Sequence, residues 1–220
     1  MVELIVKVFI SYLIGSCMGA MIIGRLKGGV DIRNMGSGNA GGTNALRTQG
    51  VSFAIGVIFI DIGKGVIGAS LIPELNIFFI NEGSVISREA LAIYCSIAVV
   101  FGHIWPIYHR FRGGKGAGTF IGTLLVLSPS LLIGFILFWL IVIVLSGFVG
   151  LATMTAAVTI PIYLGIFILP DSQLLFIYTF IMAVCIIFWH RSNIKRMYEG
   201  REHRNRSMMI FSKRSSSDNE

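Results

Sequence analysis

The sequence contains few charged residues and few cysteines. Only 13% of its 220 residues are charged, whereas a soluble domain carries about 25%. A chain with so little polar surface is neither an ordinary soluble globule nor a disordered protein. There are three cysteines, and this odd number excludes a disulfide scaffold. Cys17, Cys95 and Cys185 all lie in apolar stretches, so we expect them to be small buried hydrophobic residues.

Apolar residues are abundant and form long runs. They make up 55% of the chain, and the mean hydropathy is +0.80. A helix that spans a bilayer needs about 20 mostly apolar residues. An open sheet would leave its edges unpaired in lipid, and the runs lack the alternation of barrel strands. We therefore predict an all-α polytopic membrane protein with seven transmembrane helices. The seven runs are Val2–Ile23, Ser52–Leu71, Glu89–Tyr108, Ala117–Leu127, Ser130–Ser146, Phe148–Leu169 and Leu174–Trp189.

Two features of these runs leave alternatives open. Ala117–Leu127 is short and is followed by Ser128-Pro129. It is expected either to cross the membrane with help from its neighbours or to form a re-entrant half-helix. The fifth and sixth runs are separated by little more than Ser146-Gly147, so their boundary is the least sharply defined.

Basic residues are concentrated on one side of the predicted membrane. The segments 24–50 and 109–116, together with the tail after Trp189, hold fifteen of the eighteen Lys and Arg residues. Seven crossings put all three segments on the same side, and an excess of Lys and Arg marks the cytoplasmic side. We predict an N-terminus outside and a C-terminus in the cytoplasm. The opposite loops are nearly neutral or acidic, with Glu74, Glu82, Arg88 and Asp171.

The net charge of +7 is explained by this asymmetry and by attraction to anionic headgroups, so membrane lipids are expected partners. The basic residues have no interleaved aromatics and accompany no nucleic-acid-binding motif, so no nucleic acid is expected. Residues 1–202 are predicted to form one membrane domain. Residues 203–220 are predicted to form a basic, disordered cytoplasmic tail.

Three segments on the predicted cytoplasmic side combine glycines with polar and basic residues. They read GSGNAGGTNALRTQG from Gly36, HIWPIYHRFRGGKGAGT from His103 and HRSNIKRMYEGRE from His190. Glycines let successive backbone N–H groups turn toward one anion. Arg47 adds a fork that can bind two phosphate oxygens, and Lys115 adds an ammonium. The pattern indicates one or two substrates that carry phosphate.

Two familiar motifs do not apply here. Gly36-x-Gly38-x-x-Gly41 matches the dinucleotide fingerprint in letters, but it follows an apolar helix and no βαβ unit surrounds it. Gly114-Lys115 lacks the other residues of a P-loop. His103, His109 and His190 have no acidic residues at ligand spacing, so we expect no metal. No cofactor is expected either.

Asp61 and Lys64 lie inside the second run. A charge in the middle of a bilayer costs about 3 kcal/mol on insertion scales. At this spacing the two side chains share a helix face and can pair. They either form a structural ion pair, or Asp61 holds Lys64 as it reaches toward the phosphate site. His103 is either a satisfied buried histidine or a donor to that site, and its position just before the Gly-Lys loop favours the second.

Together these motifs identify a resemblance that extends over about residues 8–202. The chain resembles the PlsY family, the bacterial acyl-phosphate:glycerol-3-phosphate acyltransferases, in four stretches. They are GSGNAGGTNALR with the preceding DIR, DIGKG from Asp61, GHIWPIYHRFRGGKGAGT, and HRSNIKRMYEGRE.

The resemblance implies an integral enzyme of the bacterial inner membrane whose site faces the cytoplasm. It would move an acyl chain from acyl phosphate to the 1-hydroxyl of glycerol 3-phosphate, giving lysophosphatidic acid and phosphate in the first step of phospholipid synthesis. It also implies catalytic residues Ser37, Arg47, Lys115, His190 and Asn193. The residues expected to bind substrate or shape the pocket are Gly38, Asn39, Thr43, Asn44, Lys64, His103, Gly114 and Gly116.

The chain departs from the family pattern in three places. Gly147 and Gly150 stand where a basic residue and a Ser are usual, and Arg112 stands where Lys is usual. The two glycines leave a catalytically impaired relative as an alternative. An organic-phosphate transporter is a second alternative, although we find no inverted repeat. An acyl-CoA-dependent acyltransferase is a third, but neither His103 nor His190 is followed by Asp five positions later.

No Ser-His-Asp arrangement is present, so we predict no covalent acyl-enzyme. Ser37 is expected to donate a hydrogen bond rather than attack. The proton of the attacking hydroxyl then goes to His103, to His190 or to a phosphate oxygen of the substrates, and we favour the phosphate.

Overall fold

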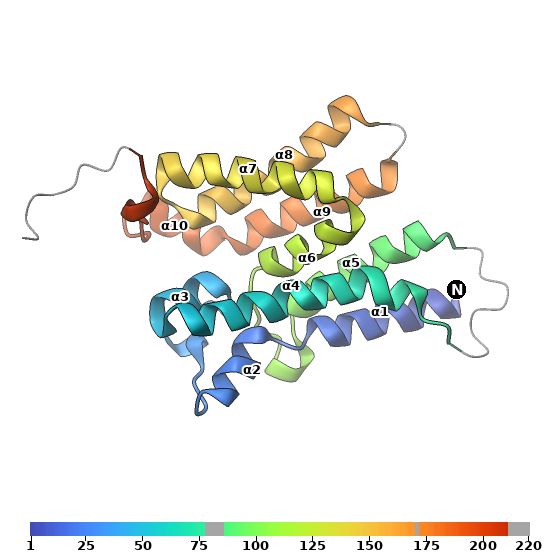
Figure 1. Cartoon of the computed structure of the whole chain (residues 1–220), viewed down its shortest axis with the longest axis horizontal. Coiled ribbons are helices and arrows are strands. Elements are labelled where there is room, and N and C mark those ends of the chain that lie inside the picture. Colours follow the sequence, from blue (N-terminus) through green and yellow to red (C-terminus); the bar gives the residue numbers. More distant parts are fainter. Residues whose placement is uncertain (78–85, 170–171, 211–220) are drawn as a thin grey trace, which may run out of the picture.

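The computed structural model describes residues 1–77, 86–169 and 172–210, and within these ranges the chain is helical with no strand. Six of the longer helices form two groups of three, which Figure 1 shows one above the other. The helices of the first group, α1 (Val2–Gly15), α4 (Val51–Glu74) and α5 (Arg88–Ile104), pack on one another. The second group comprises α7 (Pro129–Ser146), α8 (Val149–Phe167) and α9 (Gln173–Trp189). The short helix α6 (Ala117–Leu127) contacts α4, α5 and α7 and so joins the two groups.

Four described stretches are long and apolar enough to span a membrane: α4, Arg88–His109 (α5 with the 3-10 helix η2 that follows it), α7 and α8. The helix pairs α1 with α2 (Gly19–Leu26) and α9 with α10 (Arg191–Tyr198) also qualify if each bent pair counts as one span. The bends are 42° and 49°. The protein is therefore a helical membrane protein, with four to six such spans among the described helices. The predicted fourth run, Ala117–Leu127, is an apolar helix of 11 residues, which at about 1.5 Å per residue is shorter than a bilayer core.

The first predicted run, Val2–Ile23, is not one continuous helix. Lys64 from α4 donates to the carbonyl oxygens of Gly15 at 2.8 Å and of Cys17 at 2.9 Å. The carboxylate of Asp61 accepts from the backbone N–H of Gly19 at 3.2 Å. A helix end buried in an apolar bundle needs such partners. The buried ion pair on α4 therefore stabilises the break between α1 and α2.

Helix α6 packs closely on α4 because both helices have glycine at the crossing. A Cβ at Gly65 would lie 2.3 Å from the carbonyl oxygen of Thr119. A Cβ at Gly122 would lie 2.1 Å from the carbonyl oxygen of Ile62. Only glycine permits this approach, and it brings the start of α6 next to Asp61.

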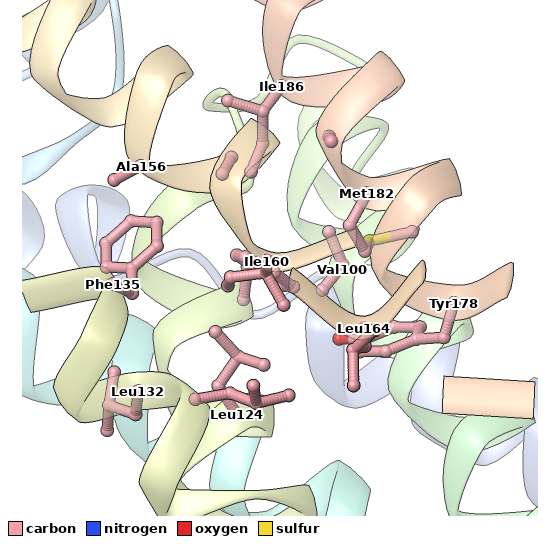
Figure 2. Packing of buried hydrophobic residues seen from close by; sticks show 14 of the residues in the cluster. Val100, Leu124, Leu132, Phe135, Ala156, Ile160, Leu164, Tyr178, Met182 and Ile186 are labelled. Atoms are coloured by element: carbon pink, nitrogen blue, oxygen red, sulfur yellow. The ribbon is translucent and has the colours of Figure 1, made fainter. Parts of the chain in front are cut away.

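The main apolar core lies between α5, α6, α7, α8 and α9 (Figure 2). Leu124 and Phe135 from α6 and α7 meet Ile160 from α8 and Met182 from α9. Tyr178 is fully buried and its hydroxyl pairs with that of Thr123 at 2.5 Å. The core fixes the second helix group against the first.

An ionic cluster around the buried Glu3–Lys7 pair joins α1, α4 and α5 away from the three glycine-rich segments. Lys7 donates to Glu3 and to the carbonyl oxygen of Pro73, both at 2.7 Å. Arg88 donates to the same two acceptors at 3.1 and 2.7 Å. Glu82 and Asp171, which the charge analysis placed on this side, lie outside the described residues.

The turn between α7 and α8 carries part of the chain that was predicted to be disordered. Gly147 has φ +75°, and the Arg204 and Met209 side chains pack where a Cβ at this glycine would point. The backbone N–H of Asn205 donates to the Gly147 carbonyl at 2.8 Å. Residues 203–210 are thus bound to the α7–α8 turn. Residues 211–220 lie outside the described ranges.

Candidate active site

The three glycine-rich segments converge on one cavity of about 270 Å³. All five residues predicted as catalytic line it. The first segment contributes through α3 (Gly42–Gln49) and the loop before it. The second contributes through the start of α6, and the third through the α9–α10 bend. The predicted residues in the cavity wall are Ser37, Asn39, Thr43, Asn44, Arg47, His103, Lys115, His190 and Asn193.

The side chain of Asn44 shapes the first loop. Its Oδ1 accepts from the backbone N–H of Ser37 at 2.9 Å. Its Nδ2 donates to the carbonyl oxygens of Ile32, Met35 and Asn39 at 2.9–3.0 Å. The hydrogen-bonding groups of the Asn44 amide are thus occupied by the backbone of the loop. Asn44 lines the cavity, but it acts as a brace of the loop that carries Ser37 rather than as a free donor to substrate.

The loop that carries Lys115 rests on His103 at the end of α5. The N–H of Gly114 donates to the carbonyl oxygen of His103 at 3.1 Å. A Cβ at Gly114 would lie 2.2 Å from Nε2 of His103, so only glycine fits. The other ring nitrogen, Nδ1, lies 3.4 Å from Oδ1 of Asp61. His103 is therefore enclosed between the loop and Asp61.

The Lys115 ammonium begins a chain of polar contacts with the third segment. It donates to Oδ1 of Asn193. Asn193 in turn donates to Glu202 at 2.9 Å, and Glu202 accepts from Nε of Arg196 at 2.6 Å. Burial lowers the pKa of Lys115 to about 8, and the cations Arg196 and Arg47 act in the same direction, while Glu202 opposes them. Lys115 is a cation that has been partly desolvated and would gain from a bound anion.

His190 ends α9 and presents one ring nitrogen to the cavity. Its Nδ1 lies 2.7 Å from the carbonyl oxygen of Ile186. Because a carbonyl only accepts, Nδ1 carries the proton of this hydrogen bond. Nε2 of the neutral ring is then left as an acceptor.

A second polar cavity of about 330 Å³ adjoins the first. Ser37, Asn39 and Lys115 line both cavities. The second one also includes Gly38 and Gly114, which were predicted to bind substrate, and the cations Arg112 and Arg191. The shared residues form a boundary between two spaces that each have basic side chains.

Two predicted residues do not line either cavity. Gly116 has φ +84° and allows the turn into α6. Lys64 is buried and its ammonium binds the Gly15 and Cys17 carbonyls as well as Asp61 at 3.2 Å. Of the two interpretations of the Asp61–Lys64 pair, these contacts fit the structural one. Lys64 does not reach toward the cavity.

Several residues in the cavity wall were not predicted to belong to the site. Asp61 and Glu202 are carboxylates in a basic cavity, and Trp139 donates to the hydroxyl of Thr153 at 3.1 Å. Glu202 is part of the third motif, and this position in the sequence could have indicated that it belongs to the site. Trp139 and Thr153 lie in apolar runs where spacing gives no such signal. A Cβ at Gly150 would lie 3.0–3.2 Å from atoms of Asn193.

No group of three or more His, Cys, Asp or Glu side chains is arranged to hold a metal ion in the part of the chain that the structure describes. The site's chemistry is that of an anion-binding pocket built from guanidinium, ammonium, amide and hydroxyl groups. The model of the family described as "Glycerol-3-phosphate acyltransferase" matches residues 5–200. The chain belongs to this family.

Curated relatives agree with the family model. A glycerol-3-phosphate acyltransferase of Thermoanaerobacter sp. (strain X514) is 39% identical, with 90% of this chain and 93% of that protein covered. Another from Chlorobium phaeobacteroides (strain BS1) is 36% identical, with 93% and 97% covered.

Two solved structures have the same fold. One is described as PlsY, an integral membrane glycerol 3-phosphate acyltransferase, in the glycerol 3-phosphate form. It has a TM-score of 0.76 and 32% identity, and the match covers 91% of this chain and 94% of that one. The lysophosphatidic acid form has a TM-score of 0.74 and 31% identity, with the same coverage. The resemblance to the PlsY family that the sequence motifs indicated is thus confirmed.

Proposed function

We propose that the protein transfers an acyl chain from acyl phosphate to the 1-hydroxyl of glycerol 3-phosphate, giving lysophosphatidic acid and inorganic phosphate. This is the first step of phospholipid synthesis. The observation that carries the proposal is the convergence of Arg47, Lys115 and His190, from three distant segments, on one cavity. Family membership and the two solved forms of the relative PlsY, with glycerol 3-phosphate and with lysophosphatidic acid, support it.

Arg47 and Lys115 are proposed to bind phosphate oxygens, because a charge-assisted contact is worth roughly 1.5–3 kcal/mol. Ser37, with Asn39 and Thr43, adds uncharged donors. Asn193 orients the Lys115 ammonium through its amide oxygen. The two adjoining polar cavities suit two phosphate-bearing substrates, and Ser37 and Lys115 at their boundary lie next to both.

Apart from Asp61, the residues that α4, α6 and α7 contribute to the cavity wall are not polar. Ile58, Ile62, Ile121 and Trp139 line it. An acyl chain that is attached to a phosphate needs such a wall beside the polar head. We propose that the acyl chain of the donor lies along these residues, with its phosphate among the basic side chains.

The proposed reaction has one chemical step. The 1-hydroxyl oxygen of glycerol 3-phosphate bonds to the acyl carbon, and the bond from that carbon to the phosphate oxygen breaks, with phosphate leaving. Because acyl phosphate is already activated, orientation and charge stabilisation can supply most of the catalysis.

The hydroxyl proton is proposed to go to a phosphate oxygen. In the described part of the chain, both carboxylates of the cavity wall already accept from protein donors: Asp61 from Gly19 and Glu202 from Arg196 and Asn193. His103 is enclosed by Gly114. Nε2 of His190 is the alternative acceptor within the protein.

The membrane topology is also part of the proposal. We propose seven crossings in the inner membrane, an outer N-terminus and a cytoplasmic active site. The N-terminus lies at one end of the bundle and α10 at the other (Figure 1), which is the arrangement expected for an odd number of crossings. Helix α6 is short because it begins at the cavity, where Ala117 and Gly118 line the wall, rather than at the membrane surface.

The experiment uses purified protein in detergent with glycerol 3-phosphate and either palmitoyl phosphate or palmitoyl-CoA. Release of phosphate and formation of lysophosphatidic acid from palmitoyl phosphate alone would support the proposal. Turnover of palmitoyl-CoA, or no turnover of either donor, would contradict it.

A further inference from the structure

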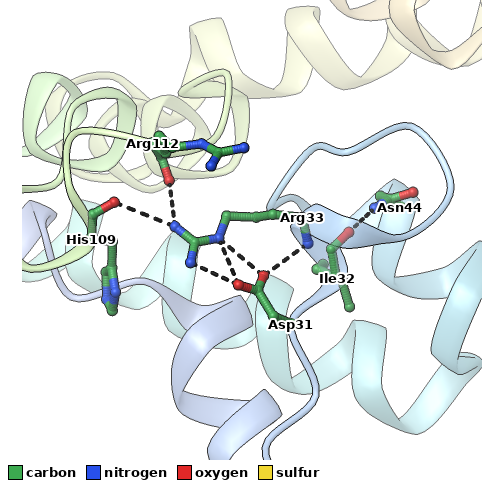
Figure 3. Close-up of polar contacts among 6 residues, drawn as sticks. All are labelled: Asp31, Ile32, Arg33, Asn44, His109 and Arg112. Carbon is green, nitrogen blue, oxygen red and sulfur yellow. Dashed lines mark hydrogen bonds and ion pairs between the residues drawn. The ribbon is translucent and has the colours of Figure 1, made fainter.

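Arg33 connects the first glycine-rich segment with the second. It lies in the 3-10 helix η1 (Ile32–Asn34), between α2 and α3. The carboxylate of Asp31 accepts from the Arg33 backbone N–H at 2.9 Å, from Nε at 3.0 Å and from Nη2 at 2.7 Å. The remaining terminal nitrogen, Nη1, donates to the carbonyl oxygens of Arg112 at 3.1 Å and His109 at 3.4 Å (Figure 3). Asp31 thus fixes the guanidinium, and the guanidinium binds the second loop.

The two carbonyls that Arg33 binds flank a strained turn. Arg110 has φ +56° and Phe111 has φ +58°, and the left-handed region is unfavourable for residues with a Cβ. The turn closes through Pro106, whose carbonyl accepts from His109 at 3.0 Å and from Phe111 at 2.9 Å. A turn of this kind persists only where its surroundings hold it, and Arg33 is bonded to the residues on both sides.

The two segments that Arg33 connects both continue into the proposed phosphate pocket. Beyond Arg112 the chain continues as Gly113-Gly114-Lys115. Beyond Arg33 it continues to Ser37, in a loop that Asn44 braces at Ile32, Met35 and Asn39. The Arg33 side chain is 19% exposed, and Arg33 itself is absent from the residues that line the two cavities. It can therefore influence the pocket only through the loops.

We propose that Arg33, held by Asp31, is a positioning residue for the acyl transfer. It fixes the first loop against the strained Arg110–Phe111 turn and so sets the distance between Ser37 and Lys115 across the shared pocket. This inference rests on the proposed function of the cavity. A lysine at this position keeps the charge, but its single ammonium cannot bond to the carboxylate and both carbonyls in this planar arrangement.

The test compares Arg33→Lys and Arg33→Gln with wild type in steady-state assays of glycerol 3-phosphate and palmitoyl phosphate. We expect kcat/KM for glycerol 3-phosphate to fall at least about tenfold in both variants, since positioning losses of this size follow from small displacements. The matched control is Arg25→Gln, which removes an exposed cation from α2 and should stay within about twofold. Near-wild-type rates for Arg33→Lys would overturn the proposal, because charge alone would then be sufficient.

A second variant tests the strained turn. Arg110 lines neither cavity. The substitution Arg110→Gly removes the energetic penalty of the left-handed conformation at this position. We expect Arg33→Gln combined with Arg110→Gly to recover at least about threefold over Arg33→Gln alone, with Arg110→Gly alone close to wild type. No recovery would contradict a role that acts through this turn.

Hydrogen exchange separates this inference from the proposed function. Backbone amides of residues 109–116 should exchange faster in Arg33→Lys than in wild type, while the amides of α8 should be unchanged. Unchanged exchange in 109–116 would overturn the inference even if the enzyme is active. Inactive wild-type protein with this exchange pattern would reject the proposed function and leave the positioning contact in place.

Discussion

The Lys115 ammonium donates to the amide oxygen of Asn193 although the two residues are 78 positions apart in the chain. This contact brings the Gly-Lys loop of the second segment against α10 of the third. Glu202 keeps the Asn193 amide oriented, since Oε1 of Glu202 accepts from Nδ2. The contact places a desolvated cation at the boundary of two cavities, where a phosphate can replace the solvation that the cation has lost.

Replacing either Arg47 or Lys115 with Ala should lower kcat/KM at least about tenfold, because a lost charge-assisted contact is worth roughly 1.5–3 kcal/mol. The measurement is phosphate release from palmitoyl phosphate. Lys27→Ala, which removes an exposed cation after α2, is the control and should have little effect. Near-normal turnover in both site variants would reject the phosphate-pocket assignment.

The pKa of Lys115, about 8, predicts how activity depends on pH. The ammonium is charged below this value and neutral above it. We expect kcat/KM for glycerol 3-phosphate to fall as the pH rises through about 8 to 10. Lys115→Arg keeps its charge over this range, so the alkaline fall should disappear in the residual activity of that variant. An unchanged alkaline limb in Lys115→Arg would assign the titration to another group.

Glu202→Ala should reduce kcat/KM by about three- to tenfold, since one buried hydrogen bond that orients Asn193 is lost and Arg196 is left without its carboxylate partner. Glu202→Gln retains an acceptor and should lose less. Initial rates for both variants test this. Equal losses in the two variants would mean that the negative charge matters and the orientation of the amide does not.

Lys64→Ala should lower stability by about 3–5 kcal/mol, because it leaves Asp61 as an uncompensated buried charge. It also leaves the carbonyl oxygens of Gly15 and Cys17 at the α1–α2 break without their donor. Thermal unfolding in detergent measures this change, with Lys27→Ala as the exposed control. A melting temperature close to wild type would contradict the structural role of the pair.

A chain that ends after Ile210 should keep wild-type activity, while one that ends after Glu202 should be less stable. The second truncation removes the hydrogen bond from Asn205 to Gly147 and the contact of Arg204 with Phe148. Comparison of the two truncations by melting temperature isolates residues 203–210. Identical melting temperatures would show that this segment does not support the α7–α8 turn.

The sequence indicated which residues would gather at one cavity where their type is unusual for the surrounding chain. Arg47, Lys115 and the surrounding glycines are unusual beside apolar runs, and phosphate binding is what such groups do. The helical class followed from the long apolar runs. These features depend on composition and local spacing, which a single sequence displays.

Contacts between distant segments could not be predicted in the same way. Spacing indicated that Asp61 and Lys64 share a helix face, but not that a break between α1 and α2 lies opposite them. Asn44 was expected to bind substrate or to shape the pocket, and only the structure shows that its amide is bonded to the backbone of the loop. The sequence analysis did not assign Glu202 to the site, and its pairing with Arg196 is visible only in three dimensions.

The most direct measurement is a crystal structure of the protein with glycerol 3-phosphate bound. The account predicts one phosphate group in contact with Arg47 from the first segment and Lys115 from the second at the same time. A phosphate held by one segment alone, or bound outside the cavity that they share, would contradict it.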